Sequence, residues 1–386
     1  MVEKKIRLTR PSLPHSAYDQ IREVLDSGYW TQGEKVAEFE TLLADYLGIG
    51  NVIVVSSGTA ALHLALLVLN LQEGDEVIIP AFSFAATANV IKICGTKPVF
   101  VDINNNDWCL NIDLLERAIT PRTKVIMPVQ EFGGMADMDA ISALADKYSL
   151  HVVEDAACAL GSEYIGKKAG TIGELGCFSF HPRKIITTGE GGAVVTNNPD
   201  LADRLRMLRN HGCIAGTGIG RKYAGKSRGG RIDQFILSGL NYRMTDFQAV
   251  LGCEQLKTIE TTIKLRQKQA EIYFKLLSGI SSLQLPEKDL SFRHTYQTYH
   301  LLLKKGKRDD LIDYLRDRNI ESNIGAQYLP GLACLKDDIN PGITWEESLK
   351  AYQNGIVLPI GGHLTEKQLE RISKAVKEFI DEQNRV

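Results

Sequence analysis

The sequence predicts an α/β protein with a large, doubly wound domain on a mostly parallel sheet, over residues 1–255, and a smaller C-terminal α+β domain, over residues 256–386. Two observations support this prediction. From Asn51 to about residue 200, short apolar runs alternate with segments of helical periodicity, which is the pattern of βαβ units. The helical spacing of 246–277 then leads into a region that mixes strand-like and helix-like segments.

Seven apolar runs in the large domain have the length and composition of strands. Their near-continuous β-branched and aliphatic residues suit strands that are covered on both faces. Between these runs lie four segments in which apolar residues recur with helical spacing. The predicted strands are 51–57, 75–82, 97–103, 123–130, 150–156, 177–181 and 192–197, and the predicted helices are 60–70, 85–94, 112–118 and 138–148.

Further helices, strands and a loop are expected before and after this alternating region. Two helices, 17–27 and 35–46, precede the first strand. In the C-terminal region, TYHLLLK and GIVLPI predict strands, and helices are expected near 308–319 and 365–383. The segment 212–231 has many glycines, five Lys or Arg residues and no apolar period, which predicts a long, mobile loop.

Composition and charge restrict the function. The chain has 386 residues, and 45 Lys and Arg against 47 Asp and Glu give a formal net charge of −2, which argues against binding nucleic acid or an acidic membrane mainly through charge. Seven cysteines are scattered without a C-x-x-C pair, so neither a disulfide framework nor a zinc site is expected and a reducing cytoplasm is favoured. No apolar window approaches the roughly 18 residues of a membrane span.

A match to the phosphate-binding P-loop pattern occurs at Gly220, Gly225, Lys226 and Ser227. A working P-loop follows a buried strand and opens a helix, so that backbone N–H groups converge on phosphate. Neither flank has this character, because CIAGTGI is not a core strand and SRGGRIDQF is not a helix start. We therefore interpret the match as part of a basic, flexible loop.

Two predicted strand ends carry residues suited to a ligand. The residues of SSGTA, 56–60, lie where small side chains and first-turn N–H groups of a helix can approach an anion, although an N-cap without a ligand explains the same residues. Asp155 ends the run LHVVED at the carboxyl edge of a predicted parallel strand, where open α/β sheets bind ligands. This acid could pair with a ring cation, a metal or a core arginine.

Lys184 lies in FSFHPRKIITTGEGG, just before glycines that bend the chain. A lysine near Gly, Ser and Thr can form a Schiff base if it is desolvated and faces an aldehyde, whereas a lone lysine is usually a solvated surface residue. The combination is more informative than the lysine alone. An anion site at 57–60, a strand-end acid at Asp155 and the amine of Lys184 are the three groups that pyridoxal 5'-phosphate requires.

At these residues the chain resembles the DegT/DnrJ/EryC1/StrS family of sugar aminotransferases, which are pyridoxal-phosphate enzymes of fold type I, the aspartate aminotransferase-like fold. The resemblance runs from about residue 9 to 380, with several motifs in one order, and FSFHPRKIITTGEGG is similar to the perosamine-synthase-like subgroup. Its most specific signatures are VVSSGTAALHLAL, IIPAFSFAATANVI, PVFVDI, VVEDAACALGS, FSFHPRKIITTGEGG, LRNHG and LNYRMTDFQAVLG.

The resemblance implies a role for each residue that matches a family motif. Lys184 would form the Schiff base with the cofactor and move the proton, and Asp155 would keep the pyridine nitrogen protonated. Phe84 would stack on the cofactor ring. Asn241 would reach the phosphate of the neighbouring subunit, which implies a homodimer with shared active sites. The residues implied to bind the cofactor phosphate are Gly58, Thr59, Ala60 and Ser179.

Two positions depart from the family pattern. Cys158 stands near the cofactor's phenolic oxygen, where relatives often have Gln or His, and a thiol is a weaker hydrogen-bonding group. Gln327 stands where many relatives have His before the Tyr, which weakens inference about the substrate. One branch of the family has His in place of the lysine and dehydrates sugars, and Lys184 argues against that branch.

The resemblance thus implies a cytoplasmic transaminase that moves an amino group, with glutamate as the expected donor, to a keto carbon of a nucleotide-linked deoxysugar, a 4-keto-6-deoxy sugar being favoured. The amino sugar would serve polysaccharide biosynthesis. A pyridoxal-phosphate dehydratase or lyase of the same fold is the first alternative, and a non-catalytic regulatory protein is the second. The residues expected to contact substrate are Tyr29, Trp30, His181, Glu190, Arg221, Lys222 and Arg231, the last three as partners of a pyrophosphate.

Overall fold

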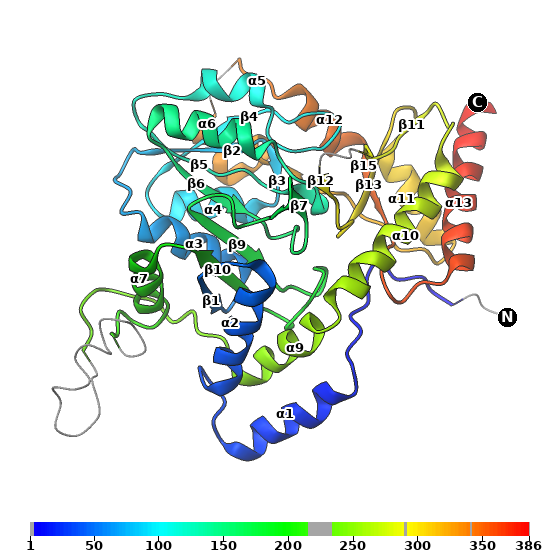
Figure 1. Ribbon diagram of the computed structural model, residues 1–386. Helices are drawn as coiled ribbons and strands as arrows, with labels where there is room; N and C mark the ends of the chain where they lie inside the picture. Colours follow the sequence, from blue (N-terminus) through cyan, green and yellow to red (C-terminus); the bar gives the residue numbers. More distant parts are fainter. Residues whose placement is uncertain (1–3, 215–233, 289–291, 340–341, 386) are drawn as a thin grey trace.

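The computed structural model consists of a large α/β domain and a smaller C-terminal domain (Figure 1). Helices cover both faces of the seven-stranded central sheet of the large domain. The fold class predicted from the sequence is therefore confirmed. The described residues are 4–214, 234–288, 292–339 and 342–385.

The central sheet has the strand order β1-β10-β9-β6-β5-β2-β4. Six of its strands run in one direction, and β10 opposes both of its neighbours. Each of the seven strands predicted from the sequence contributes a strand to this sheet. These strands are β1 (Asn51–Val55), β2 (Glu76–Pro80), β4 (Lys97–Val101), β5 (Thr123–Ile126), β6 (His151–Asp155), β9 (Leu175–Ser179) and β10 (Gly192–Thr196).

Alternate residues of the strands enter two hydrophobic clusters, one on each face of the sheet. In β1, Val52 and Val54 belong to one cluster, and Ile53 and Val55 belong to the other. Burial on both faces explains why the strands have continuous apolar sequences. One face is covered by α2 (Glu34–Leu47), α6 (Met138–Tyr148) and α9 (Asp246–Leu256), and the other by α3 (Gly58–Val68), α4 (Ala85–Ile93) and α7 (Pro199–Arg209).

The segment 246–277, expected as one long helix, forms two helices. The first, α9, ends at Leu256, and α10 (Ile259–Leu277) begins after Thr258, whose φ of −120° and ψ of 13° interrupt the helix. The break allows α9 to pack Leu256 into the core of the large domain, whereas α10 packs Tyr273 into the C-terminal core. We propose the boundary between the domains at this break, next to the division expected from the sequence.

The C-terminal domain is built on a three-stranded antiparallel sheet of order β11-β13-β15. TYHLLLK and GIVLPI supply two of these strands, as the sequence predicts. Helices α10, α11 and α13 bury their apolar faces against the sheet, and α10 and α13 lie side by side (Figure 1). The elements are β11 (Leu283–Gln284), β13 (Tyr299–Leu303), β15 (Gly355–Leu358), α11 (Arg308–Asp317), α12 (Glu346–Asn354) and α13 (Glu366–Arg385).

Short strand pairs connect the C-terminal region to the large domain. The strand β14 (Gln327–Tyr328) pairs with β3 (Phe82–Ser83), so the segment around residue 327 meets the turn that precedes α4. A second pairing joins β12 to β7 and β8. The remaining elements are α1 (Ser16–Ser27), α5 (Ile112–Leu115), β7 (Glu163–Tyr164), β8 (Lys167–Lys168), β12 (Phe292–Arg293) and 3-10 turns at Glu116–Ala118, Glu131–Gly133, Leu329–Gly331 and Ala333–Asp338.

None of the helices in the described part of the chain is both long and apolar enough to span a membrane. The described residues also contain no group of His, Cys, Asp and Glu that could hold a metal ion. All seven cysteines are free thiols. Of the predicted loop 212–231, residues 215–231 lie outside the described residues, and so does the P-loop-like match at 220–227.

Candidate active site

The predicted site residues gather at the carboxyl edge of the central sheet. Asp155 is the last residue of β6 and Ser179 is the last residue of β9, and these two strands are parallel neighbours. Lys184 lies in the turn that follows β9, where its amide donates to the carbonyl of His181 at 2.8 Å. The chain therefore brings an acid, a hydroxyl and an amine to one edge, where α/β sheets bind ligands.

The N-terminus of α3 forms an anion site beside Ser179. The Ser57 hydroxyl caps the helix by accepting from the Ala60 amide at 3.0 Å, which leaves the amides of Gly58 and Thr59 without a partner in the described hydrogen bonds. A Cβ atom on Gly58 would lie 2.7 Å from Ser179 Cβ, so only glycine permits this close approach. Two free amides at a helix N-terminus next to a hydroxyl match the needs of a phosphate group.

Asp155 is a buried acid, 3% exposed, with two hydrogen-bond donors. Thr87 Oγ1 donates to it at 2.8 Å and the Ala157 amide donates at 3.2 Å. Burial raises the pKa of the Asp155 carboxyl, although these two donors and the charge of Lys184 oppose the increase. Each carboxyl oxygen accepts one bond, so an additional N–H donor such as a protonated ring nitrogen can still be accommodated.

The side chain of Lys184 is half-buried, and its Nζ atom donates to Cys158 Sγ at 3.0 Å. Burial alone would lower the pKa of the Lys184 ammonium, but nearby acidic groups raise it above the ordinary lysine value. These groups are Cys158, Glu131 and Asp155. Burial also raises the pKa of the Cys158 thiol. The lysine is therefore held at the edge of β6, as a Schiff-base amine must be.

Phe84 presents an aromatic ring at the same edge. Its side chain is 63% exposed although its neighbours Phe82 and Ser83 are buried, and it lies at the N-terminus of α4. The Gln327 side chain accepts from the amide of Ala85 at 3.3 Å. Gln327, at the position where many relatives have His, therefore lies next to this turn. An exposed ring, an anion site, a buried acid and a half-buried amine together fit pyridoxal phosphate.

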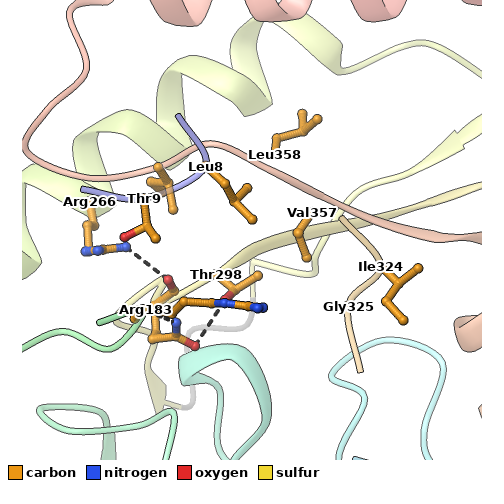
Figure 2. A pocket seen from close by; sticks show the side chains of 11 residues that line it. Leu8, Thr9, Arg183, Arg266, Thr298, Ile324, Gly325, Val357 and Leu358 are labelled. Carbon is orange, nitrogen blue, oxygen red and sulfur yellow. Dashed lines mark hydrogen bonds between the residues drawn. The ribbon is translucent and has the colours of Figure 1, made fainter. Parts of the chain in front are cut away.

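A cavity of about 50 Å³ lies beside the lysine segment (Figure 2). Arg183, the residue before Lys184, lines this cavity together with Leu8 and Thr9 near the N-terminus and residues of the C-terminal domain that include Arg266 and Gln297. Gln297 Nε2 donates to the carbonyl of Arg183 at 2.7 Å, and Arg266 Nη1 donates to the carbonyl of Gln297 at 2.9 Å. The C-terminal domain thus holds the backbone next to Lys184.

The candidate substrate residues are distributed around the molecule. His181 is half-buried in the lysine turn, and burial lowers its pKa. Glu190 is exposed, and its carbonyl accepts from Gln248 Nε2 at 2.9 Å. Tyr29 and Trp30, 81% and 51% exposed, lie between α1 and α2, and no described contact joins them to Lys184. Arg221, Lys222 and Arg231 lie outside the described residues.

Asn241, predicted to reach the phosphate of a neighbouring subunit, is exposed on the surface. Its backbone forms a bridge with Asn210, and the carbonyl of the next residue, Tyr242, accepts from the amide of Ser56 at 2.9 Å. Asn241 therefore lies near the start of α3 in its own chain. Its contact with a second subunit stays a prediction.

Sequence reasoning missed two polar residues of the site. Thr87, within the predicted helix 85–94, donates to Asp155. Glu131 is buried at 5% exposure and interacts electrostatically with Lys184 and Asp155. Glu131 directly follows the predicted strand 123–130, and an acid at such a strand end is the same signal that identified Asp155. Burial raises the pKa of Glu131 to about 8.

Several known proteins are similar to this chain over most of its length. The DegT/DnrJ/EryC1/StrS aminotransferase family model matches residues 12–377. GDP-perosamine synthase of Caulobacter vibrioides is 35% identical over 97% of this chain and 98% of its own. A Shewanella sediminis protein, UDP-4-amino-4-deoxy-L-arabinose–oxoglutarate aminotransferase, is 36% identical over 84% of each chain. The solved PLP form of Spr1654 from Streptococcus pneumoniae has a TM-score of 0.86 and 29% identity, over 96% of this chain and 97% of its own.

Proposed function

Because this chain belongs to the DegT/DnrJ/EryC1/StrS aminotransferase family, we propose that it transfers the amino group of glutamate to a keto carbon of a nucleotide-linked deoxysugar. It is a pyridoxal-phosphate-dependent sugar aminotransferase. The observation that carries the proposal is the arrangement at the end of β6, where the Lys184 amine contacts Cys158 beside the buried carboxyl of Asp155. A lysine that only stabilised the fold would not need the buried acid Asp155 among the groups that act on it.

Five side chains or amides would hold the cofactor. The free amides of Gly58 and Thr59, with the Ser179 hydroxyl, suit its phosphate, the Asp155 carboxyl suits its ring nitrogen, and Phe84 suits its ring face. When bound, pyridoxal phosphate withdraws electrons from the carbon that carries the amino group, so that a proton can leave this carbon.

Asp155, Lys184 and Cys158 then have different roles in the reaction. Asp155 must stay ionised, and the donors Thr87 and Ala157 favour its charged form against the effect of burial. Lys184 takes the proton from the substrate carbon and returns it at the next position. Cys158 fixes the Nζ atom of Lys184 through their contact at 3.0 Å.

The substrate class is inferred from the relatives and from the motif resemblance. One relative is named a GDP-perosamine synthase, and another is named an aminotransferase of a UDP-linked amino sugar and oxoglutarate. Oxoglutarate is the keto acid that glutamate becomes when it loses its amino group, so these names support glutamate as the donor. We favour a 4-keto-6-deoxy sugar as the acceptor, with polysaccharide biosynthesis as the use of the product.

Two further parts of the proposal concern assembly and location. We propose a homodimer in which Asn241 contributes to the partner's cofactor site, because Asn241 is exposed near the start of α3. We also propose a cytoplasmic location, because none of the seven cysteines is in a disulfide bond, as a reducing compartment favours.

The test is a product assay with purified protein, pyridoxal phosphate, glutamate and a panel of nucleotide-linked 4-keto-6-deoxy sugars. An aminotransferase forms oxoglutarate and an amino sugar in equal amounts. A dehydratase or lyase would consume the sugar without forming an amino sugar, and a binding protein would consume neither. Lys184→Ala, assayed in parallel, should form no product.

A further inference from the structure

Arg266 is a buried arginine of the C-terminal domain that has no acidic partner. It lies on the buried face of α10, at helical spacing from Ile263 and Ala270, and it is 6% exposed. No Asp or Glu of the described residues forms an ion pair with it, and burial lowers its pKa to about 10, so it is a cation at neutral pH. A buried charge without a partner is costly to the fold, so its presence requires an explanation.

The guanidinium of Arg266 uses one of its nitrogen atoms to hold the backbone. Both of its described hydrogen bonds start at Nη1, which donates to the carbonyls of Tyr296 at 3.3 Å and Gln297 at 2.9 Å. Nε is buried without a partner. A Cβ atom on Gly361 would lie 3.3 Å from Nη2, so glycine at this position keeps space beside the guanidinium. Nε and Nη2 form one edge of the guanidinium, and this two-donor edge matches the two oxygens of a carboxylate.

Arg308 is a second buried arginine of the same domain, and its hydrogen bonds differ. It is 8% exposed, and its Nη1 donates to the carbonyls of Tyr352 at 2.9 Å and Gly355 at 3.1 Å. Its Nε donates to the carboxylate of Asp309. Both arginines hold backbone carbonyls, but Arg308 also has an acid for its Nε. The contacts of Arg266 with carbonyls therefore leave the edge of Nε and Nη2 unexplained.

The cavity in Figure 2 lies beside Arg266 and beside the lysine segment. Its volume of about 50 Å³ exceeds the roughly 10 to 15 Å³ that one water molecule needs, so it has room for a group of a few atoms. Two of its described lining residues, Arg183 and Arg266, are arginines, and none of them is Asp or Glu. A small cavity lined by charges of one sign favours an anion.

Two hydrogen bonds connect this cavity to the backbone next to Lys184. Arg266 Nη1 donates to the carbonyl of Gln297, and Gln297 Nε2 donates to the carbonyl of Arg183 at 2.7 Å (Figure 2). The Nζ atom of Lys184 instead contacts Cys158, and Lys184 is not among the residues that line the cavity. The cavity therefore lies beside the lysine backbone rather than around its reactive atom.

We propose that this cavity binds the side-chain carboxylate of the amino donor, and that Arg266 selects glutamate over donors with a neutral side chain. The α-carboxylate of glutamate is attached to the reacting carbon, whereas two methylene groups separate the side-chain carboxylate from it. A cavity beside the lysine backbone suits the more distant of the two groups. The edge of Nε and Nη2 donates to its two oxygens, and Arg183 adds positive charge. The inference rests on the proposed function, since it requires glutamate as the donor.

The first test measures binding without turnover. Glutarate has the two carboxylates of glutamate but no amino group, so it cannot enter the reaction. Its affinity for the full chain with pyridoxal phosphate is measured by isothermal titration calorimetry. Arg266→Gln should weaken glutarate binding about 10- to 100-fold, because two charge-assisted hydrogen bonds are lost. Arg266→Lys keeps the charge without the two-donor edge, so it should weaken binding less.

The matched control is Arg308→Gln. Arg308 is as deeply buried as Arg266 and also holds backbone carbonyls of the C-terminal domain, but it does not line the cavity. This variant should leave the affinity for glutarate unchanged. An unchanged affinity in Arg266→Gln, an equal loss in Arg308→Gln, or a wild type that does not bind glutarate would overturn the proposal. If Arg266→Gln does not fold, Arg266→Lys against Arg308→Lys decides in the same way.

The second test compares two donors in the half-reaction of the holoenzyme, followed by stopped-flow absorbance. Glutamine has the shape of glutamate with a neutral amide in place of the side-chain carboxylate. The ratio of kcat/KM for glutamate to kcat/KM for glutamine is not altered by damage that slows both reactions equally. Arg266→Gln should lower this ratio about 10- to 100-fold, and Arg308→Gln should leave it unchanged.

The outcomes of this comparison separate the inference from the proposed function. A wild type that reacts with neither donor would contradict the proposed function. A wild type that reacts with glutamate, together with an Arg266→Gln variant that keeps the wild-type ratio, would contradict the role of Arg266 alone.

Discussion

Glu154 and Glu131 are two buried glutamates beside the same strand ends, and they differ in their hydrogen bonds. The Glu154 carboxylate accepts from three backbone amides of the segment 170–173, at 2.7 to 2.8 Å, and from Gln130 Nε2 at 3.1 Å. Glu131 has no donor among the described side chains, and the amide of Phe132 is the hydrogen-bond donor to its carboxyl group. Hydrogen bonds surround the Glu154 carboxylate, whereas Glu131 interacts electrostatically with Lys184 and Asp155.

The number of hydrogen-bond donors distinguishes an acid that stabilises the fold from an acid that can bind another group. Four donors satisfy a carboxylate, so Glu154 ties the loop after β8 to the sheet and has no capacity for another ligand. Asp155, the next residue, has two donors and remaining capacity, and Glu131 has fewer still. Among these buried acids, the number of hydrogen bonds to the carboxyl group therefore decreases from Glu154 to Asp155 and then to Glu131.

The largest loss of activity is expected when Lys184 is replaced. Lys184→Ala should reduce transamination by at least about 10³-fold, because the proton-transfer group is lost. The half-buried side chain contributes little to the core, so the melting temperature of the cofactor-free chain should change little. Product formation by the purified variant is the measurement, and retention of more than a few per cent of the activity would contradict the assignment.

Asp155→Asn should have the next largest effect, a loss of about 10² to 10³-fold in kcat, because a neutral amide does not stabilise a protonated ring nitrogen. Thr87 can still donate to the amide oxygen, so the fold should persist. Steady-state kinetics at saturating glutamate and sugar measure this loss. A variant with a raised KM and an unchanged kcat would instead indicate that Asp155 serves only binding.

Glu154→Gln tests the opposite face of the strand. Glutamine offers one acceptor oxygen where the carboxylate accepted bonds at two, so at least one buried amide loses its partner and the apparent stability should fall by about 2 to 3 kcal/mol. Glu131→Gln should change stability by less than about 1 kcal/mol near pH 7, because Glu131 is already mostly uncharged there. Urea unfolding of both variants compares them, and equal losses would remove the distinction drawn here.

His300 tests whether a missing partner is enough to mark a functional residue. Both of its ring nitrogens are buried without a partner, yet it packs against Phe132 and Trp108 in a hydrophobic cluster. Burial lowers its pKa to about 3, so the folded chain binds fewer protons than the unfolded chain between about pH 6.5 and 3. Its contribution to stability is complete above about pH 6.5 and is lost as the pH falls.

The measurement is the dependence of unfolding on pH in wild type and His300→Leu. In the wild type His300 should contribute a slope of up to about 1.4 kcal/mol per pH unit below pH 6.5, and His300→Leu should reduce the slope by that amount. Activity at neutral pH should be retained in this variant. A loss of activity without a change in slope would show that His300 belongs to the site.

The sequence predicts the sheet, and the place of Asp155 at the end of one of its strands, for physical reasons. Strands covered on both faces have continuous apolar sequences, so all seven strands were recognisable, and Asp155 was visible as a charge at the end of one of them. The break at Thr258 was not predicted, because threonine carries no turn signal and the packing of two different cores decides it. The helical periodicity of 246–277 does not show that its two halves pack into two different hydrophobic cores.

Thr87 could not be assigned to the site from sequence for a related reason. Its role depends on its hydrogen bond to Asp155, which is distant along the chain and meets it only when the strands align. Gly58 shows the same limit: the sequence indicates an anion site, but only the structure shows that a side chain there would collide with Ser179.

The central claim is that Lys184 and its acidic neighbours form the working site of an aminotransferase. The most direct measurement is the near-visible absorbance of the purified protein with pyridoxal phosphate, before and after excess glutamate, beside Lys184→Ala. The account predicts a band of lysine-bound cofactor in the wild type that glutamate converts to the amine form, and no such band in the variant. The same band in Lys184→Ala, or a wild-type band that glutamate leaves unchanged, would contradict it.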